Sequence, residues 1–284
     1  MSEDSTDPWG QHASTYDRVF APLTGYIARS MLAMTDARLP EGARVLDIAC
    51  GSGALLIPAI ERAQRHRARG GTDFVVGCDF SEGMVNIARD KARARFEPDA
   101  FSCTVQDGQA LSEADASFDA AFSCFGIFLF PDRAAGWREA ARVLRPGGVF
   151  AATSWVAPEH NEMFRAQFGP MMEALPERIT DGMSPPDWLV VADPEAFAAE
   201  VTEAGFRDVQ TRQFRTEFVL PSAEVAWSTM LDNPIAGAIV RECTEAERAA
   251  VRSAFDASMH ARSGGPGRPI VLEAVCNVLT ATRA

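Results

Sequence analysis

The stretch Arg44-Val-Leu-Asp-Ile-Ala-Cys-Gly-Ser-Gly53 decides the fold of this chain. Its first half carries the short apolar run that is typical of a buried parallel strand. Gly51 and Gly53 then predict a tight turn that leads into a helix. Because glycine has no Cβ, such a turn lets the backbone come close to a ligand. The stretch therefore predicts a nucleotide-type site at the mouth of an α/β sheet.

The same stretch indicates which kind of nucleotide is bound. A dinucleotide fingerprint requires a third glycine three residues after the second, and Leu56 occupies that position. Asp47 lies just before the glycines, where a carboxylate would repel a pyrophosphate and attract an ammonium group. The turn therefore favours an adenosine ligand that has a positively charged tail and no phosphates, and it disfavours a nicotinamide-dependent dehydrogenase.

The composition limits the class of partner. The chain has 284 residues, of which 47% are hydrophobic, so it can bury a sizeable core. Its formal net charge of -12 argues against nucleic acid or an anionic membrane as the main partner. The acidic N-terminal segment does not resemble a signal peptide, and no apolar run is long enough to span a bilayer. The six cysteines form no CxxC motif, which favours buried reduced thiols in a cytoplasmic protein and implies no metal site.

A second acidic strand end follows the first helix. The strand expected over 74–79 ends in Asp79, whose carboxylate can accept both hydroxyls of a ribose. Asp79 could instead cap the next helix, but Ser81 can take that role and leave Asp79 free. Phe80 and Met84 flank the ribose position and are placed to sandwich a purine ring.

A third strand, expected over 101–106, ends in Asp107-Gly108. Asp107 is placed to accept a hydrogen bond from an exocyclic amine, although an Asp-Gly turn is common anywhere. Further strands over 117–124 and 149–155 alternate with helices, which implies a parallel sheet with right-handed crossovers. Ligands of such sheets bind beyond the carboxyl ends of the strands, where Asp107 and the aromatic segment beginning at Phe125 fall.

Together these residues resemble the class I S-adenosylmethionine-dependent methyltransferases of the small-molecule type, similar to the ubiquinone and menaquinone C-methyltransferases. The resemblance covers residues 9–155 and, more loosely, 194–209. It implies an α/β fold with a Rossmann-like seven-stranded, mostly parallel sheet whose last strand is antiparallel. It also implies S-adenosyl-L-methionine as the cofactor.

The resemblance carries residue roles with it. The glycine turn with Asp47 would hold the methionine part, Asp79 the ribose and Asp107-Gly108 the adenine. Phe125 would offer its backbone carbonyl to the methionine amine, and Tyr16 matches a tyrosine that often covers the cofactor. Tyr16 can equally belong to an ordinary amphipathic helix, and both interpretations stay open. The implied cofactor-binding set is Tyr16, Asp47, Ala49, Gly51, Gly53, Asp79, Phe80, Met84, Asp107, Gly108 and Phe125.

We expect one methyltransferase domain over residues 1–284 with helical cap insertions. Methionine and aromatic residues gather in the segment after the fifth strand and favour a cap that encloses an apolar pocket, although each of them alone also fits a protein core. The expected parts are an N-terminal helical lid (1–38), a cofactor-binding core (39–155), two cap insertions (156–192 and 222–264) and the C-terminal part of the sheet (193–221 and 265–284).

The predicted activity is methyl transfer to a small, fairly apolar metabolite. Transfer from a sulfonium is an in-line displacement that gains its rate from alignment and from exclusion of water. A general base is needed only where the acceptor must lose a proton, and the candidates are His160, His12 and Tyr16. The alternative is an S-adenosylmethionine-binding protein that acts as a scaffold or catalyses a cyclisation or rearrangement. The expected partners are a small-molecule acceptor, with neither nucleic acid nor membrane, and the expected state is a monomer or homodimer.

Overall fold

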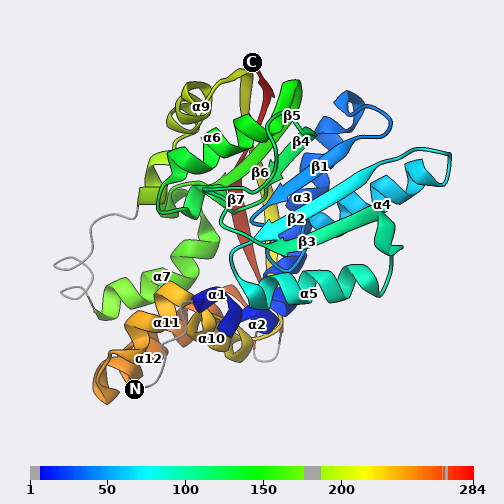
Figure 1. Ribbon diagram of the computed structural model, residues 1–284. Coiled ribbons are helices and arrows are strands. Elements are labelled where there is room, and N and C mark those ends of the chain that lie inside the picture. The colour runs from blue at the N-terminus through cyan, green and yellow to red at the C-terminus, as the bar shows by residue number, and fades with distance from the viewer. Residues whose placement is uncertain (1–6, 176–186, 264, 266–267) are drawn as a thin grey trace, which may run out of the picture. The chain divides into compact units, whose positions relative to one another are not determined.

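The computed structural model describes residues 7–175, 187–263, 265 and 268–284, and the chain divides into two compact units (Figure 1). Unit 1 comprises Met1–Trp155, Val190–Phe214 and Asn277–Ala284. Unit 2 comprises Val156–Leu189 and Arg215–Cys276. No helix among the described residues has both the length and the apolar character that crossing a membrane requires.

The strands form a single sheet. They are β1 Arg44–Ile48, β2 Phe74–Asp79, β3 Phe101–Val105, β4 Phe118–Ser123, β5 Leu144–Trp155, β6 Phe206–Leu220 and β7 Ile270–Arg283. Over the described part of the chain the sheet is seven-stranded, in the order β3-β2-β1-β4-β5-β7-β6, and β1 to β5 are paired in parallel. Bonds from Asn277 to Ser154 and from Val156 to Val275 show that β7 runs antiparallel to β5. The predicted mostly parallel, Rossmann-like sheet with an antiparallel last strand is therefore confirmed.

The strand order creates a crevice beside β1. Along the chain the sheet grows from β1 to β2 and β3, and it then returns to β4 on the opposite side of β1. Ligands of open α/β sheets bind outside the carboxyl ends of the strands where the order reverses in this way. The residues that follow Ile48 and Ser123 therefore occupy the position at which a ligand is expected.

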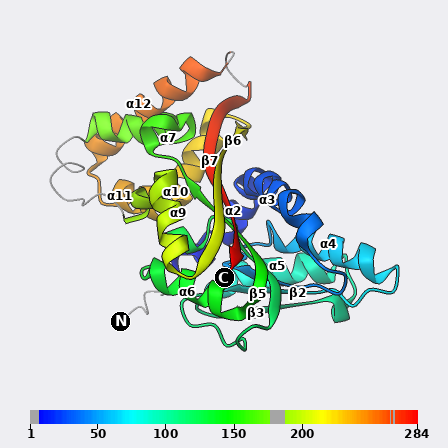
Figure 2. The same cartoon turned by 90° about the horizontal axis from the view of Figure 1, so that it is seen from above.

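Helices cover both faces of the sheet in unit 1. Figure 2 shows α3, α4 and α5 on one side of the strands and α6 and α9 on the other. This arrangement follows from right-handed crossovers that leave β1 in opposite directions. The helices of unit 1 are α1 Pro8–Gln11, α2 Ala13–Val19, α3 Ala21–Thr35, α4 Leu56–Arg67, α5 Glu82–Arg93, α6 Arg133–Val143 and α9 Pro194–Glu203, with short 3-10 helices η1 Asp36–Arg38, η2 Pro98–Ala100 and η3 Ile127–Leu129.

An aromatic cluster holds α6 and α9 against the sheet. The ring of Trp137 lies 6.0 Å from that of Phe150 and 5.7 Å from that of Phe197, measured between centroids. Its indole N–H donates to Glu200 at 2.9 Å, and Arg133 pairs with the same carboxylate at 2.7 Å. A buried indole retains its hydrogen bond in this way, so the cluster fixes α6 and with it the preceding loop that follows β4.

Unit 2 is largely helical. Helices α7 and α12 pack together, with the Ser258 hydroxyl donating to the Ala166 carbonyl at 3.0 Å and Arg262 paired with Glu162 at 3.3 Å. Residues 176–186 of the predicted cap insertion, 1–6 of the predicted lid, and 264, 266 and 267 lie outside the described residues. The helices are η4 Pro158–His160, α7 Glu162–Ala174, α10 Ala223–Asp232, α11 Pro234–Arg241 and α12 Glu245–Arg262, while η5 Asp187–Ala192 crosses from unit 2 into unit 1.

Candidate active site

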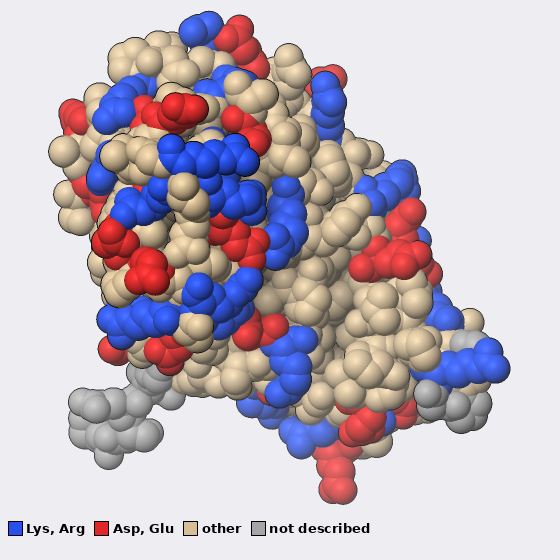
Figure 3. Space-filling view, turned by 90° about the vertical axis from the view of Figure 1, so that its right-hand side faces the viewer, with Lys and Arg blue, Asp and Glu red and all other residues tan. Residues whose placement is uncertain are grey.

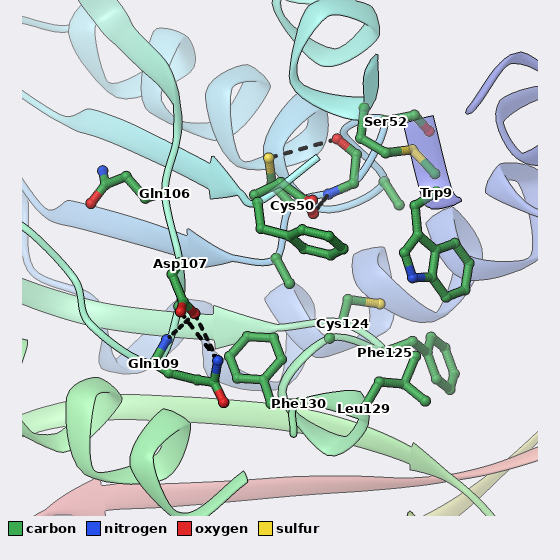
Figure 4. Close-up of a pocket in the computed structure, with 18 of the residues that line it drawn as sticks. Trp9, Cys50, Ser52, Gln106, Asp107, Gln109, Cys124, Phe125, Leu129 and Phe130 are labelled. Carbon is green, nitrogen blue, oxygen red and sulfur yellow. Dashed lines mark hydrogen bonds between the residues drawn. The ribbon is translucent and has the colours of Figure 1, made fainter. Parts of the chain in front are cut away.

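A cavity of about 440 Å³ lies at the carboxyl ends of β1 to β4. This is the edge of the sheet at which the strand order predicts a ligand, and the volume suits a small molecule. Figure 4 shows Asp107, Gln109 and Phe130 at one end of the cavity and Trp9 and Phe125 at the other. The wall consists of Trp9, Tyr16, Ala49, Cys50, Gly51, Ser52, Ala54, Asp79, Phe80, Met84, Gln106, Asp107, Gly108, Gln109, Cys124, Phe125, Gly126, Leu129, Phe130 and Pro131.

The turn after β1 has the unusual backbone that its sequence predicts. Gly51 and Gly53 have φ values of +52° and +95°, and Ala49 has a φ of +58°. A non-glycine residue in this left-handed region stores strain of about 1–3 kcal/mol and is most often found at a functional site. Ala49 and Gly51 line the cavity, whereas Gly53 lies next to Ala88 and Ile57 and does not.

Asp79 joins the turn after β1 to the start of α5. Its Oδ2 accepts the Gly51 N–H at 2.8 Å, and its Oδ1 accepts the Ser81 N–H at 2.9 Å. Ser81 caps α5, as predicted, by accepting the Met84 N–H at 3.2 Å. Burial raises the pKa of Asp79, while these backbone N–H groups oppose the rise. Each oxygen of a carboxylate has two lone pairs, so Asp79 can still accept hydrogen bonds from a ligand in the cavity.

Asp47 lies behind the turn and is only 1% exposed. Among the described residues, neither of its carboxylate oxygens has a partner at full hydrogen-bond geometry, and the nearby backbone N–H of Leu56 offsets only part of the cost of burial. Burial raises the pKa of Asp47 well above its ordinary value. A buried acceptor without a partner is rare in folded proteins and requires an explanation. A cationic group at the glycine turn would supply the missing interaction, although the Asp47 side chain is not part of the cavity wall.

The loop after β3 builds the opposite end of the cavity. Asp107 accepts the backbone N–H of Gln109 at 2.9 Å and its side-chain amide at 3.0 Å, and Gln109 in turn accepts the Asp132 N–H at 2.7 Å (Figure 4). A Cβ at Gly108 would come within 2.6 Å of the Phe130 ring. A larger residue at position 108 would therefore displace the Phe130 ring, and the bare backbone of Gly108 lets the two loops approach closely.

The loop after β4 begins with a strained Phe125. Its φ is +58°, its N–H donates to the Thr153 hydroxyl at 2.8 Å, and its ring stacks on Trp155 with 4.0 Å between centroids. A bulky residue at positive φ is a genuine outlier that the surrounding contacts must stabilise. The next residue, Gly126, leaves no room for a Cβ, which would lie 2.4 Å from the Cβ of Ala49. The loops after β1 and β4 therefore contact each other directly beside the cavity.

The N-terminal helices bring Trp9 and Tyr16 to the cavity wall. The Tyr16 ring meets Trp9 edge-on at 6.0 Å and stacks on Phe20 at 5.6 Å. Its enclosed position raises the pKa of Tyr16 far above its ordinary value, so the phenol stays protonated and suits donation of a hydrogen bond better than removal of a proton. His12 lies between α1 and α2, and His160 lies in η4 of unit 2. Neither histidine belongs to the cavity wall, and their roles as bases stay predictions.

Sequence reasoning missed several residues of the wall. The sequence alone assigns no role to Trp9 or Gln109, and both line the cavity. The aromatic run after the fourth strand was noted, but only Phe125 was assigned to the site, whereas Leu129 and Phe130 also line it. Their positions depend on how η3 folds back over the sheet, which local sequence does not encode. The unusual density of aromatic residues in a loop was the available signal.

Gly83→Ala is expected to weaken binding of S-adenosylhomocysteine about three- to tenfold, because α1 must shift. A Cβ at Gly83 would lie 2.7 Å from the Cα of Gly10. Because this neighbour is a backbone atom, it cannot move aside as easily as the end of a side chain. The shift would move Trp9 away from the wall, a packing change of about 1 kcal/mol. Isothermal titration calorimetry measures the affinity. Gly169→Ala in α7 is the matched control because its Cβ meets nothing within 4 Å, and equal affinities for both variants would contradict the prediction.

Comparisons with known proteins agree with this geometry. Residues 45–148 match a family described as a methyltransferase domain. The chain is 31% identical to the demethylmenaquinone methyltransferase of Corynebacterium kroppenstedtii over 207 residues, which are 69% of this chain and 83% of the relative. It is also 31% identical to the nocamycin O-methyltransferase of Saccharothrix syringae over 265 residues, 89% of this chain and 90% of the relative. The crystal structure of YcgJ from Bacillus subtilis shares the fold, with a TM-score of 0.55, 16% identity and coverage of 90% of this chain and 98% of that one.

The chain belongs to the class I S-adenosylmethionine-dependent methyltransferases. Its cofactor is S-adenosylmethionine. The described residues fit this molecule in two respects that do not depend on the comparisons. The positive-φ turn at Gly51 offers bare backbone at the cavity wall, and the unpartnered carboxyl of Asp47 lies directly behind that turn.

Proposed function

We propose that the chain transfers a methyl group from S-adenosylmethionine to a small, fairly apolar metabolite. The aromatic and aliphatic part of the cavity wall, formed by Trp9, Phe125, Leu129, Phe130 and Pro131, carries this proposal. Apolar walls with few polar groups are the usual form of small-molecule sites. Similarity to a demethylmenaquinone methyltransferase and a nocamycin O-methyltransferase supports an acceptor of this class.

We assign the parts of the cofactor to the two ends of the cavity. Asp79 would bind the ribose hydroxyls, and Asp107 with Gly108 would bind the adenine. Phe80 lines the cavity and is 48% exposed as a residue, and a purine stacked on its ring would bury apolar surface. Met84 would contact the other face of the purine, as the sequence predicts.

The methionine part would lie at the glycine turn. Of the residues assigned to it, Ala49, Gly51 and Phe125 line the cavity, whereas Asp47 and Gly53 lie behind its wall. An ammonium group there would supply the partner that Asp47 lacks among the described residues. Pairing with a cation favours the charged form of a carboxyl group, so binding would oppose the effect of burial on the pKa of Asp47.

When bound, S-adenosylmethionine supplies an electrophilic methyl group on a sulfonium. The chain contributes alignment and a dry environment, and well-oriented reactants can gain about 7–11 kcal/mol over free ones. Tyr16 and Trp9 exclude water from their side of the cavity, and the neutral Tyr16 phenol orients the reactants by donating a hydrogen bond. A base is required only for an acceptor that must lose a proton, and His12 and His160 stay the candidates for that step.

Nucleic acid and membrane are not the proposed partners. Basic side chains alternate with acidic ones on the face drawn in Figure 3. Arginines of the described residues pair with neighbouring carboxylates, as in Arg67 with Asp99, Arg95 with Glu61 and Arg145 with Asp119. With a net charge of -12, this pattern disfavours a polyanion. We propose a cytoplasmic monomer or homodimer, and the cap role of 156–192 and 222–264 stays a prediction.

Incubation with methyl-labelled S-adenosylmethionine and a panel of acceptors tests the function. The panel pairs a short-chain demethylmenaquinol and a phenolic polyketide with carboxylated analogues of each, and it adds a short oligonucleotide. We expect label transfer to the apolar acceptors, with kcat/KM at least about tenfold above that of the carboxylated analogues because an unpaired carboxylate is costly in an apolar cavity. Transfer that prefers the charged analogues or the oligonucleotide would overturn the proposal.

A further inference from the structure

Two cysteine sulfurs approach each other beneath the glycine turn. The Sγ atoms of Cys50 and Cys103 lie 3.9 Å apart, although Cys50 follows β1 and Cys103 belongs to β3. Both residues are buried, with 4% and 7% of their surface exposed, and neither forms a disulfide. Cys50 also lines the cofactor cavity, where Figure 4 shows its thiol bonded to the Gly51 carbonyl. The pair is therefore both close together and open to the cavity from one side.

Gly77 in β2 makes this approach possible. Strand β2 lies between β1 and β3, and Gly77 is paired in register with Cys103. Residues two strands apart in a sheet are separated by roughly 9.5 Å, so side chains at such positions do not normally touch. A Cβ at Gly77 would lie 3.2 Å from the Cys50 Sγ. The Cys50 side chain thus occupies the space above Gly77 and reaches across β2 to Cys103.

The two thiols are chemically different. The contact with the Cys50 thiol lowers the pKa of the Cys103 thiol, and the charge of Arg89 lowers it further. Arg89 is held there by a hydrogen bond of 2.9 Å to the Cys103 carbonyl. The contact with Cys103 and burial both raise the pKa of Cys50. Such an arrangement makes Cys103 the more reactive sulfur and Cys50 its resolving partner.

We propose that Cys50 and Cys103 form a reversible disulfide that turns off cofactor binding. Hydrogen peroxide is the oxidant: both S–H bonds and the O–O bond break, one S–S bond forms, and two water molecules leave. The oxidant enters through the cavity, whose wall includes Cys50. A dithiol restores the pair by exchange, and it leaves as the oxidised dithiol.

Disulfide formation would change the cofactor site because the two sulfurs must move closer together. The sulfurs must close from 3.9 Å to about 2.05 Å, which pulls Cys50 towards β3. Cys50 lies between Ala49 and Gly51, two positive-φ residues that line the cavity. The movement therefore disturbs the Gly51 N–H that donates to Asp79. Because a bound cofactor fills the cavity, it would also shield Cys50 from the oxidant.

The first measurement detects the bond itself. The intact protein is treated with hydrogen peroxide, with and without S-adenosylhomocysteine, and its peptides are mapped by mass spectrometry without reduction. We expect a Cys50–Cys103 linkage in the free protein that disappears with dithiothreitol and is at least about tenfold less abundant when the ligand is present, because a ligand in excess leaves little free protein. Sulfinic acid at Cys103 without the linkage, or a linkage that ligand does not suppress, would overturn the proposal.

The second measurement tests whether the disulfide weakens cofactor binding. This part of the inference rests on the proposed cofactor site. Calorimetry with S-adenosylhomocysteine should show at least about a tenfold weaker affinity after oxidation, the equivalent of one lost charge-assisted hydrogen bond, and full recovery after reduction. Cys103→Ala should keep its affinity under peroxide, whereas Cys276→Ala should lose it as the wild type does. If the protein carries the Cys50–Cys103 disulfide and its affinity is unchanged, the proposed loss of cofactor binding is refuted. Failure of the reduced protein to bind at all would instead refute the cofactor site, and the linkage map would still stand.

Discussion

Asp79→Ala is expected to raise the dissociation constant for S-adenosylhomocysteine about 100-fold. The carboxylate accepts the Gly51 N–H, and Asp79 also lines the cavity. We assign two ribose hydroxyls to it, and each charge-assisted hydrogen bond contributes about 1.5 kcal/mol or more. Two such bonds correspond to about a 100-fold change in affinity. The substitution also leaves the Gly51 N–H without an acceptor, which loosens the turn after β1.

Matched variants separate the charge of Asp79 from its shape. Asp79→Asn retains one acceptor oxygen, so we expect it to lose only about tenfold in affinity. Asp99→Ala removes an exposed carboxylate that pairs with Arg67 on the surface, and it should bind as the wild type does. Calorimetry gives the affinities, and thermal unfolding shows whether each variant is folded. A folded Asp79→Ala protein with wild-type affinity would place the ribose elsewhere.

The sequence predicts the first half of the sheet well because its signals there are local. A short apolar run, a glycine pair and an acidic strand end each depend on neighbouring residues, so β1, β2 and the turn between β1 and α4 lie where they are expected. The boundaries are less accurate. Helix α4 begins at Leu56 and not directly after Gly53, because two residues in the left-handed region cannot continue a right-handed helix.

Strand β5 shows a second limit of local reasoning. It begins at Leu144, although Arg145-Pro-Gly-Gly148 reads as a turn that precedes the strand. Its pairing with β4 shifts register between Phe118 and Ala120, and a bulge of this kind accommodates the irregular residues. The register belongs to the pair of strands and not to either sequence, so the expected start at Val149 was too late.

The site residues show the same difference between features that local sequence predicts and features that depend on distant packing. The acidic and glycine residues at the strand ends could be assigned to one edge of the sheet, because parallel strands bring their carboxyl ends together. Whether each side chain lies in the cavity wall or behind it could not be predicted. Asp47 and Gly53 lie behind the wall, while Gln109 and Phe130 are part of it. Depth depends on twist and on the packing of distant loops, such as the contact of Gly126 with Ala49.

Asp47→Asn is expected to change the stability and the affinity of the protein in opposite directions. Burial raises the pKa of Asp47 well above its usual value, which is about 3.9 in an unfolded chain. Between these two values the folded state binds more protons than the unfolded state, so the free energy of unfolding falls as the pH rises. The fall can reach about 1.4 kcal/mol per pH unit. The asparagine variant lacks this dependence, so its advantage should be small near pH 4 and grow as the pH rises towards the folded-state pKa of Asp47.

Denaturant unfolding of the ligand-free wild type and of Asp47→Asn across this pH range measures the difference in stability, and the control Asp99→Asn should retain the wild-type slope.

Asp47→Asn also removes the carboxylate charge that we expect to pair with the ammonium group of the cofactor. We therefore expect the affinity for S-adenosylhomocysteine to fall about tenfold at neutral pH, the equivalent of about 1.4 kcal/mol. A stabilised variant with wild-type affinity would show that Asp47 only shapes the turn. Parallel pH curves for wild type and Asp47→Asn would show that its carboxyl is not held neutral, because a protonated side chain and an amide differ only where the proton is lost.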